Sequence, residues 1–148
     1  EKVFAHELVH AMVNDAMGAE ASTVLPLWFH VGIAVYGADQ GDQMLQNYVY
    51  ATSGWAESRL LNGLDGPHGA MDYAEDYLAF KYIFEKHGVN SLHNFVRFVV
   101  EDKKPIPEAL QNSCFEDWQK FQENARKFGL QAIKDVGPPK RDYNGKPY

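Results

Sequence analysis

The sequence lacks the features that mark several large classes of protein. It has one cysteine, Cys114, which excludes an intrachain disulfide framework and leaves the redox compartment open. No apolar run approaches the roughly 18 residues that a membrane-spanning helix needs, and no stretch resembles a signal peptide. Basic residues are the minority, and the net charge of −6 argues against a nucleic-acid partner. We therefore expect neither nucleic acid nor a membrane as a partner.

Strand patterns are missing as well, since no segment alternates convincingly between apolar and polar residues. The 148 residues are 45% hydrophobic and 23% charged, which is typical of a globular domain able to bury a core. These features predict an all-α fold, with one helical domain over residues 1–130 and a tail over 131–148. Because Glu1 leads directly into a helical pattern, we expect the chain to be a piece of a larger polypeptide or assembly.

Helices are expected over most of the chain. Residues 2–17 and about 26–37 carry apolar side chains on almost every side, which predicts two buried helices. Gly18 suits the end of the first helix, and Pro26 suits the first turn of the second. Further helices are expected at about 41–54, 55–61, 72–87, 91–101, 105–110 and 115–128.

The first of these helices contains "HELVH", in which two histidines stand four residues apart and a glutamate follows the first. Positions i and i+4 lie on one face of a helix, so His6 and His10 can direct two imidazoles at one metal ion. Glu7 beside them can accept a proton from metal-bound water. The alternative is a buried helix whose histidines are satisfied by hydrogen bonds. Three polar residues on an otherwise apolar helix favour a zinc site, because buried polar groups need partners.

A second stretch, "LPLWFHVGIAVY" at residues 25–36, follows this motif. Together the two stretches resemble the gluzincin superfamily of zinc metallopeptidases, and in particular the metallopeptidase domains inserted in some bacterial flagellins, the flagellinolysins. In that superfamily the second helix reads roughly Leu-Pro-x-Trp-Phe-x-Glu-Gly-x-Ala-x-Tyr. Every anchor is matched here except the glutamate, whose position holds Val31. The resemblance covers about residues 1–128.

The resemblance implies a zinc-dependent metallopeptidase that hydrolyses peptide or protein substrates, with His6 and His10 as ligands and Glu7 as general base and acid. It also implies a third ligand at position 31 and an acidic supporting residue at position 35, and both positions hold valine. We expect Val31 and Val35 to line an apolar, substrate-facing wall beside the metal. Such enzymes bind the substrate backbone along a sheet edge that precedes the metal helix. Only five residues precede His6 here, so that upstream sheet is absent from the sequence.

His30 is the candidate for completing the zinc site, although it points about 100° away from position 31 around the helix. A hydrogen bond between helices is the competing interpretation for it. Tyr73 or Tyr77 resembles the downstream residue that donates to the oxyanion in similar enzymes, and packing in the core is the competing interpretation. The alternative function is a non-catalytic or engineered helical scaffold that binds metal or ligand. Other possible contributors to the site are His68, Asp39, Asp42 and Glu57.

Overall fold

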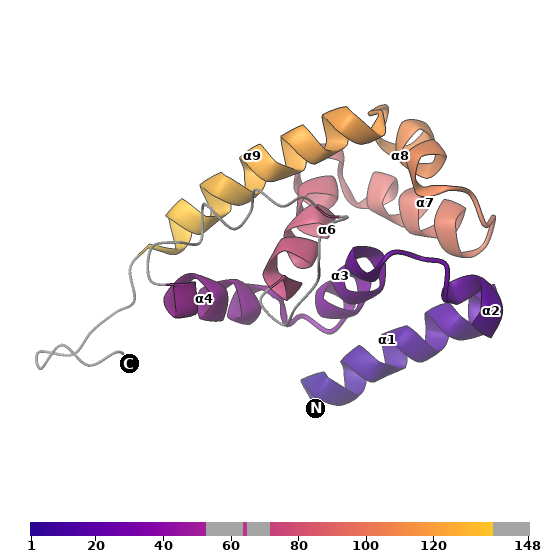
Figure 1. Cartoon of the computed structure of the whole chain (residues 1–148), viewed down its shortest axis with the longest axis horizontal. Helices are drawn as coiled ribbons and strands as arrows, with labels where there is room; N and C mark the ends of the chain where they lie inside the picture. Colours follow the sequence, from indigo (N-terminus) through magenta and orange to yellow (C-terminus); the bar gives the residue numbers. More distant parts are fainter. Residues whose placement is uncertain (53–63, 65–71, 138–148) are drawn as a thin grey trace, which may run out of the picture.

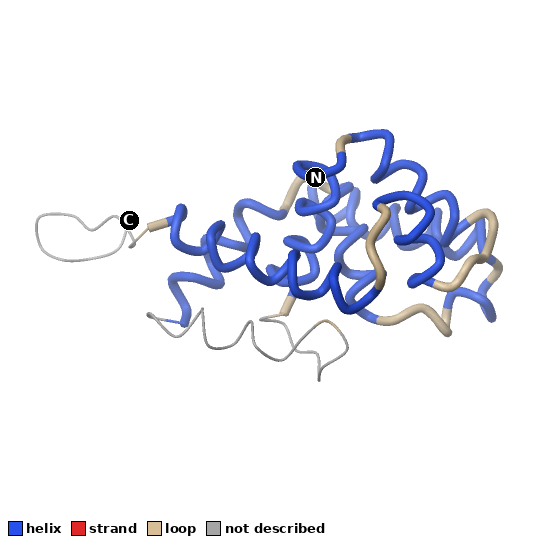
Figure 2. Tube along the Cα trace, turned by 90° about the horizontal axis from the view of Figure 1, so that it is seen from above, coloured by secondary structure: helices blue, strands red, loops and turns tan. Residues whose placement is uncertain are grey.

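The structure, a computed structural model, describes residues 1–52, 64 and 72–137, and these residues form eight α-helices and no strand (Figures 1 and 2). The predicted all-α fold is therefore confirmed for this part of the chain. The helix expected at 55–61 lies outside the described residues. The helices are α1 (Lys2–Met17), α2 (Ala19–Ser22), α3 (Leu27–Gly37), α4 (Gly41–Thr52), α6 (Tyr73–His87), α7 (Val89–Val100), α8 (Ile106–Cys114) and α9 (Trp118–Val136).

Helix α6 lies in the middle of the fold and contacts α3, α4, α7 and α9, while α1 lies along α3 (Figure 1). The most extensive of these contacts is between α3 and α6, and a glycine allows the two helices to approach closely. A Cβ atom on Gly32 would lie 2.6 Å from both the carbonyl oxygen of Asp76 and the ring of Phe80. Any larger residue would push the two helices apart. The position of α3 against α6, and with it the position of α1, therefore depends on Gly32.

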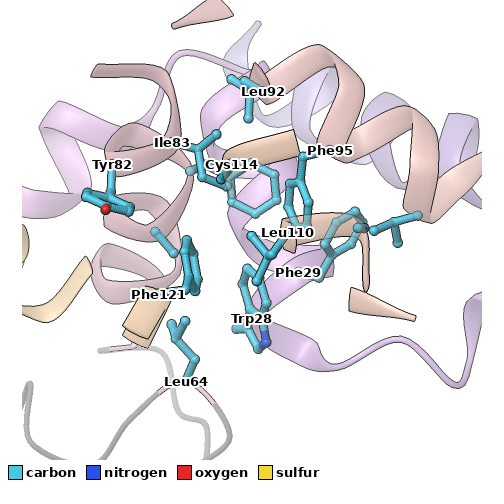
Figure 3. Packing of buried hydrophobic residues seen from close by; sticks show 14 of the residues in the cluster. Trp28, Phe29, Leu64, Tyr82, Ile83, Leu92, Phe95, Leu110, Cys114 and Phe121 are labelled. Carbon is cyan, nitrogen blue, oxygen red and sulfur yellow. The ribbon is translucent and has the colours of Figure 1, made fainter. Parts of the chain in front are cut away.

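The main core is aromatic and centres on α3, as Figure 3 shows for Trp28 and Phe29 among their neighbours. Both side chains are fully buried, which confirms the prediction that this helix lies inside the protein. The sulfur of Cys114 belongs to the same core, and burial raises the pKa of its thiol. The cysteine is therefore a packing residue, as expected for a buried thiol. The other large aromatic residues of this core are Phe80, Phe95 and Phe121.

The prediction that the first helix is buried on almost every side is wrong. Only Val13 and Met17 of α1 are buried apolar residues. The opposite face is open to solvent, and Phe4 is 74% and Met12 62% exposed. The physical reason is that α1 packs on one side only, mainly against α2 and α3. An apolar sequence can bury a helix only where other elements surround it, and none of the described residues covers this face.

The last helix also differs from its predicted extent of 115–128. It begins at Trp118 because the Asp117 carboxylate accepts a hydrogen bond from the backbone N–H of Lys120 at 2.8 Å, an N-cap. It continues to Val136, over the first residues of the predicted tail. Ile133 extends the apolar face there and is 5% exposed, and Gly137 ends the helix with a φ of 71°. Residues 131–136 are thus part of the packed structure.

Candidate metal centre

The two histidines of "HELVH" face each other on α1. Their Nε2 atoms are 3.1 Å apart and share a hydrogen bond, in which one ring donates and the other accepts, as the competing interpretation of the motif expected. The ring centroids are separated by 4.8 Å with an interplanar angle of 76°. Two imidazole ligands of a tetrahedral zinc ion place their nitrogens about 3.3 Å apart, given Zn–N distances of about 2.0–2.1 Å. Both rings are half-buried. The helical spacing thus brings His6 and His10 together with nearly the separation that one metal ion requires.

The other ring nitrogen of His6 has a partner that sequence reasoning missed. The Gln40 side-chain oxygen lies 2.9 Å from His6 Nδ1. Gln40 follows α3 in the sequence "GADQG", where no motif distinguishes it from any other polar turn residue. An amide oxygen only accepts hydrogen bonds, so Nδ1 of His6 carries the proton and Nε2 keeps its lone pair. Histidines that bind metals commonly donate their other ring N–H to an acceptor in this way.

The environment of His10 favours its neutral form. Burial is the largest cause that lowers the pKa of His10, and the neighbouring His6 and His30 lower it further, while the carboxylate of Glu7 acts in the opposite direction. A histidine must be neutral to bind a metal ion. His10 is therefore available as a ligand at neutral pH. Glu7 itself is exposed, so water and solutes can reach its carboxylate.

His30 lies near the pair without completing a metal site. Its ring centroid is 6.2 Å from that of His10, and its Nε2 donates to the backbone carbonyl oxygen of Ser22 at 2.7 Å. This is the hydrogen bond between segments that the sequence offered as the competing interpretation. Across residues 1–52, 64 and 72–137, no group of three or more His, Cys, Asp or Glu side chains is placed to hold a metal ion. A third ligand from His30 remains a prediction.

The two valines of α3, which were expected to line a substrate-facing wall, lie in the protein interior. Val31 is 8% exposed and Val35 is fully buried. Both belong to a second apolar cluster, in which α3 meets α4, α6 and α9 through residues such as Leu45 and Ile133. Leu27, one turn before Val31 on the same side of α3, is open to solvent, with 59% of its surface exposed. Neighbouring helices thus cover both valines, and a contact of Val31 or Val35 with substrate stays a prediction.

The tyrosines predicted to stabilise an oxyanion have other contacts. The hydroxyl of Tyr77 donates to the Asp42 carboxylate at 3.0 Å, and burial is the main cause that raises the pKa of Tyr77 to about 12. Tyr73 is half-buried against the second apolar cluster. These positions agree with the competing interpretation of packing in the core, and a role for either tyrosine in catalysis stays a prediction. Asp39 forms an ion pair with Lys2 at 3.2 Å. His68 and Glu57 lie outside the described residues.

A separate group of polar side chains surrounds a buried carboxylate where α8 meets α9. Glu116 is 6% exposed and accepts hydrogen bonds from the Tyr82 hydroxyl at 2.6 Å and from His87 Nε2 at 2.9 Å. Burial and the nearby carboxylate both raise the pKa of Tyr82, so its hydroxyl keeps its proton and acts as a donor. With its charge partnered in this way, Glu116 ties the end of α6 to the joint between α8 and α9.

Comparisons with known proteins add no relative: no protein family, curated protein or solved structure matches the chain. Within the described residues, no helix is both long enough and apolar enough to cross a membrane. The histidine pair and the two sequence motifs are therefore the features that bear on function.

Proposed function

We propose that this chain is the helical part of a gluzincin-type zinc metallopeptidase domain. His6 and His10 would hold the zinc ion, and a peptide or protein would be the substrate. The observation that carries the proposal is the separation of 3.1 Å between the two Nε2 atoms. The bond between Gln40 and His6 Nδ1 supports it, because it leaves the lone pair of His6 on Nε2, the nitrogen that faces His10.

The donor set fits zinc in kind, since neutral imidazoles are preferred zinc ligands. When bound, zinc would supply Lewis acidity and would lower the pKa of a water molecule to about 7. The protein's own contributions are distinct from this. His6 and His10 orient the site, and the exposed Glu7 takes up a proton from the attacking water and later returns it to the leaving amine. Position 31 offers no third donor, so we expect the zinc affinity of this chain to lie below that of a three-ligand site.

The packing of α3 favours a second candidate function, a non-catalytic helical scaffold that binds a metal or another ligand. Val31 and Val35 lie in an apolar cluster that would have no place for the acidic residues of an active gluzincin. In this candidate the histidine pair holds metal weakly and Glu7 has no catalytic role. Hydrolytic activity separates the two candidates.

Metal binding is the first test of the proposal. Zinc affinity is measured at neutral pH by competition with a chromogenic chelator, for the wild-type chain and for the variants His6→Ala, His10→Ala and His93→Ala. His93 is an exposed histidine on α7 and serves as the matched control. We expect stoichiometric binding that disappears in the first two variants and is unchanged in the third. Binding that survives both His6→Ala and His10→Ala would refute the proposed site.

Hydrolysis is the second test. The zinc-loaded chain is incubated with denatured casein and with a quenched-fluorescence peptide library, beside its Glu7→Gln variant. The metallopeptidase proposal predicts cleavage that Glu7→Gln removes while zinc affinity stays the same. Zinc binding without any cleavage would instead favour the scaffold.

A further inference from the structure

The turn between α3 and α4 holds Gln40, whose side chain contacts Nδ1 of His6, the ring nitrogen that does not face His10. Gln40 reaches this nitrogen from 34 positions along the chain, with its side-chain oxygen 2.9 Å from Nδ1. Both residues are half-buried. Because the two residues are far apart in the sequence, their contact depends on where the turn lies relative to α1.

The backbone of the turn is bonded back onto α3 at three successive residues. The N–H of Ala38 donates to Ala34 at 3.0 Å, that of Asp39 donates to Tyr36 at 3.1 Å, and that of Gln40 donates to Val35 at 3.1 Å. Asp39 adopts the left-handed conformation with a φ of 53°, which is uncommon for a residue with a side chain. This reversal directs the next residue, Gln40, back toward α1. A strained conformation of this kind persists only where surrounding contacts hold it.

Contacts on two sides hold the turn in place. On the side of α1, the Lys2 ammonium donates to the Asp39 backbone oxygen and to its carboxylate, the latter at 3.2 Å. On the side of α6, Gly41 lies directly on the ring of Tyr77, where an added Cβ would come within 2.0 Å of a ring atom. The turn can therefore move neither away from α1 nor toward α6 without losing a contact or creating a clash.

We infer that Gln40 is a positioning residue for the metal site, which fixes both the orientation and the tautomer of His6. A neutral imidazole carries one proton on its two ring nitrogens, so one nitrogen donates a hydrogen bond and the other keeps a lone pair that can bind a metal. The Gln40 oxygen accepts from Nδ1–H, so the proton cannot occupy Nε2, the atom that faces His10. The role of Gln40 in metal binding rests on the proposed function. The tautomer of His6 does not, because it is a property of the metal-free chain.

The chemistry of the amide distinguishes Gln40 from other acceptors. A carboxylate at the same place would accept the same hydrogen bond and would also make the imidazole a better donor to the metal, because its charge stabilises the Nδ1 proton. An apolar side chain would remove the bond and release the ring. We therefore expect Gln40→Glu to preserve or strengthen zinc binding, and Gln40→Leu to weaken it by about 10- to 100-fold.

Two measurements test the inference. The first is zinc affinity by chelator competition, for wild type, Gln40→Leu, Gln40→Glu and Gln43→Leu. Gln43 is exposed on α4, where its amide donates to the Asn47 side chain at 3.0 Å, so its variant is the matched control. The second is the tautomer of His6 in the metal-free chain, from the nitrogen-15 shifts of its ring. Circular dichroism and urea unfolding check that each variant is folded.

The expected result is an Nδ1–H tautomer at His6 in wild type and in Gln43→Leu, and a mixture of tautomers in Gln40→Leu. Zinc affinity should be the same in wild type and Gln43→Leu and lower in Gln40→Leu. Unchanged tautomer and affinity in Gln40→Leu would overturn the inference. If wild type itself fails to bind zinc, the proposed function fails, and the tautomer data alone then decide whether Gln40 positions the ring. A loss of affinity with an unchanged tautomer would assign Gln40 another role and would also overturn the inference.

Discussion

Replacing Val31 with glutamate tests whether α3 keeps the geometry of a metal-binding helix. Val31 is 8% exposed and packs with Leu45 of α4 in the second apolar cluster. A carboxylate that stays within this cluster has to be neutral, and protonating an ordinary glutamate at pH 7 requires about 4 kcal/mol. In the absence of metal we therefore expect Val31→Glu to lower the melting temperature by roughly 8–16 °C, at about 2–4 °C per kcal/mol for a chain of this size.

Zinc should offset part of this loss if the new carboxylate can turn toward His6 and His10. A third protein ligand completes the set that catalytic zinc sites generally have. We expect zinc to bind Val31→Glu at least about a hundredfold more tightly than wild type, which corresponds to ~2.7 kcal/mol. At a zinc concentration of about one hundred times the new dissociation constant, the melting temperature should rise by roughly 5–10 °C.

The assay is thermal unfolding with and without zinc, combined with chelator competition. Leu45→Glu is the matched control, because Leu45 is 4% exposed in the same cluster and has no expected role as a ligand. It should lose a similar amount of stability and gain no more from zinc than wild type does, since it keeps only His6 and His10 as ligands. The reasoning is refuted if Val31→Glu behaves like this control. In that event α3 has been repacked, and the scaffold becomes the better description of the protein.

The histidine pair, the buried glutamate and the turn each lead to a further expectation. Because the folded state lowers the pKa of His10 below its ordinary value of 6.5, the metal-free protein should lose stability as pH falls through 6.5 toward the folded pKa, and His10→Gln should lessen this slope in urea unfolding between pH 8 and 5. Tyr82→Phe should lower the free energy of unfolding by about 1.5–3 kcal/mol, since Glu116 loses a hydrogen-bond donor while buried; a change below half of the lower figure would contradict this. Gly41→Ala should lower the free energy of unfolding by about 1–3 kcal/mol, because the added methyl group overpacks against Tyr77. Like Gln40→Leu, it should also weaken zinc binding.

Local patterns in the sequence were sufficient for several features. The spacing of His6 and His10 determined that their rings would share one face, because a helix fixes the i, i+4 relation regardless of what surrounds it. Gly18 and Gly88 mark the ends of α1 and α6, where each adopts a positive φ that other residues rarely adopt. The apolar residues around all sides of α3 likewise predicted its burial, which Trp28 and Phe29 confirm.

Other features depend on contacts between distant segments, which local periodicity does not encode. The sequence of α1 carries apolar residues on almost every side, yet Phe4 is exposed because the described helices pack on one side of α1 only. Val31 was expected beside the metal, and the packing of α4 and α6 against α3 covers it instead. The contact between Gln40 and His6 needs the turn to be held between Lys2 and Tyr77. The sequence by itself determined which residues could bind a metal, while the tertiary structure decided which of them have partners, because side chains from distant segments meet only after the helices have packed.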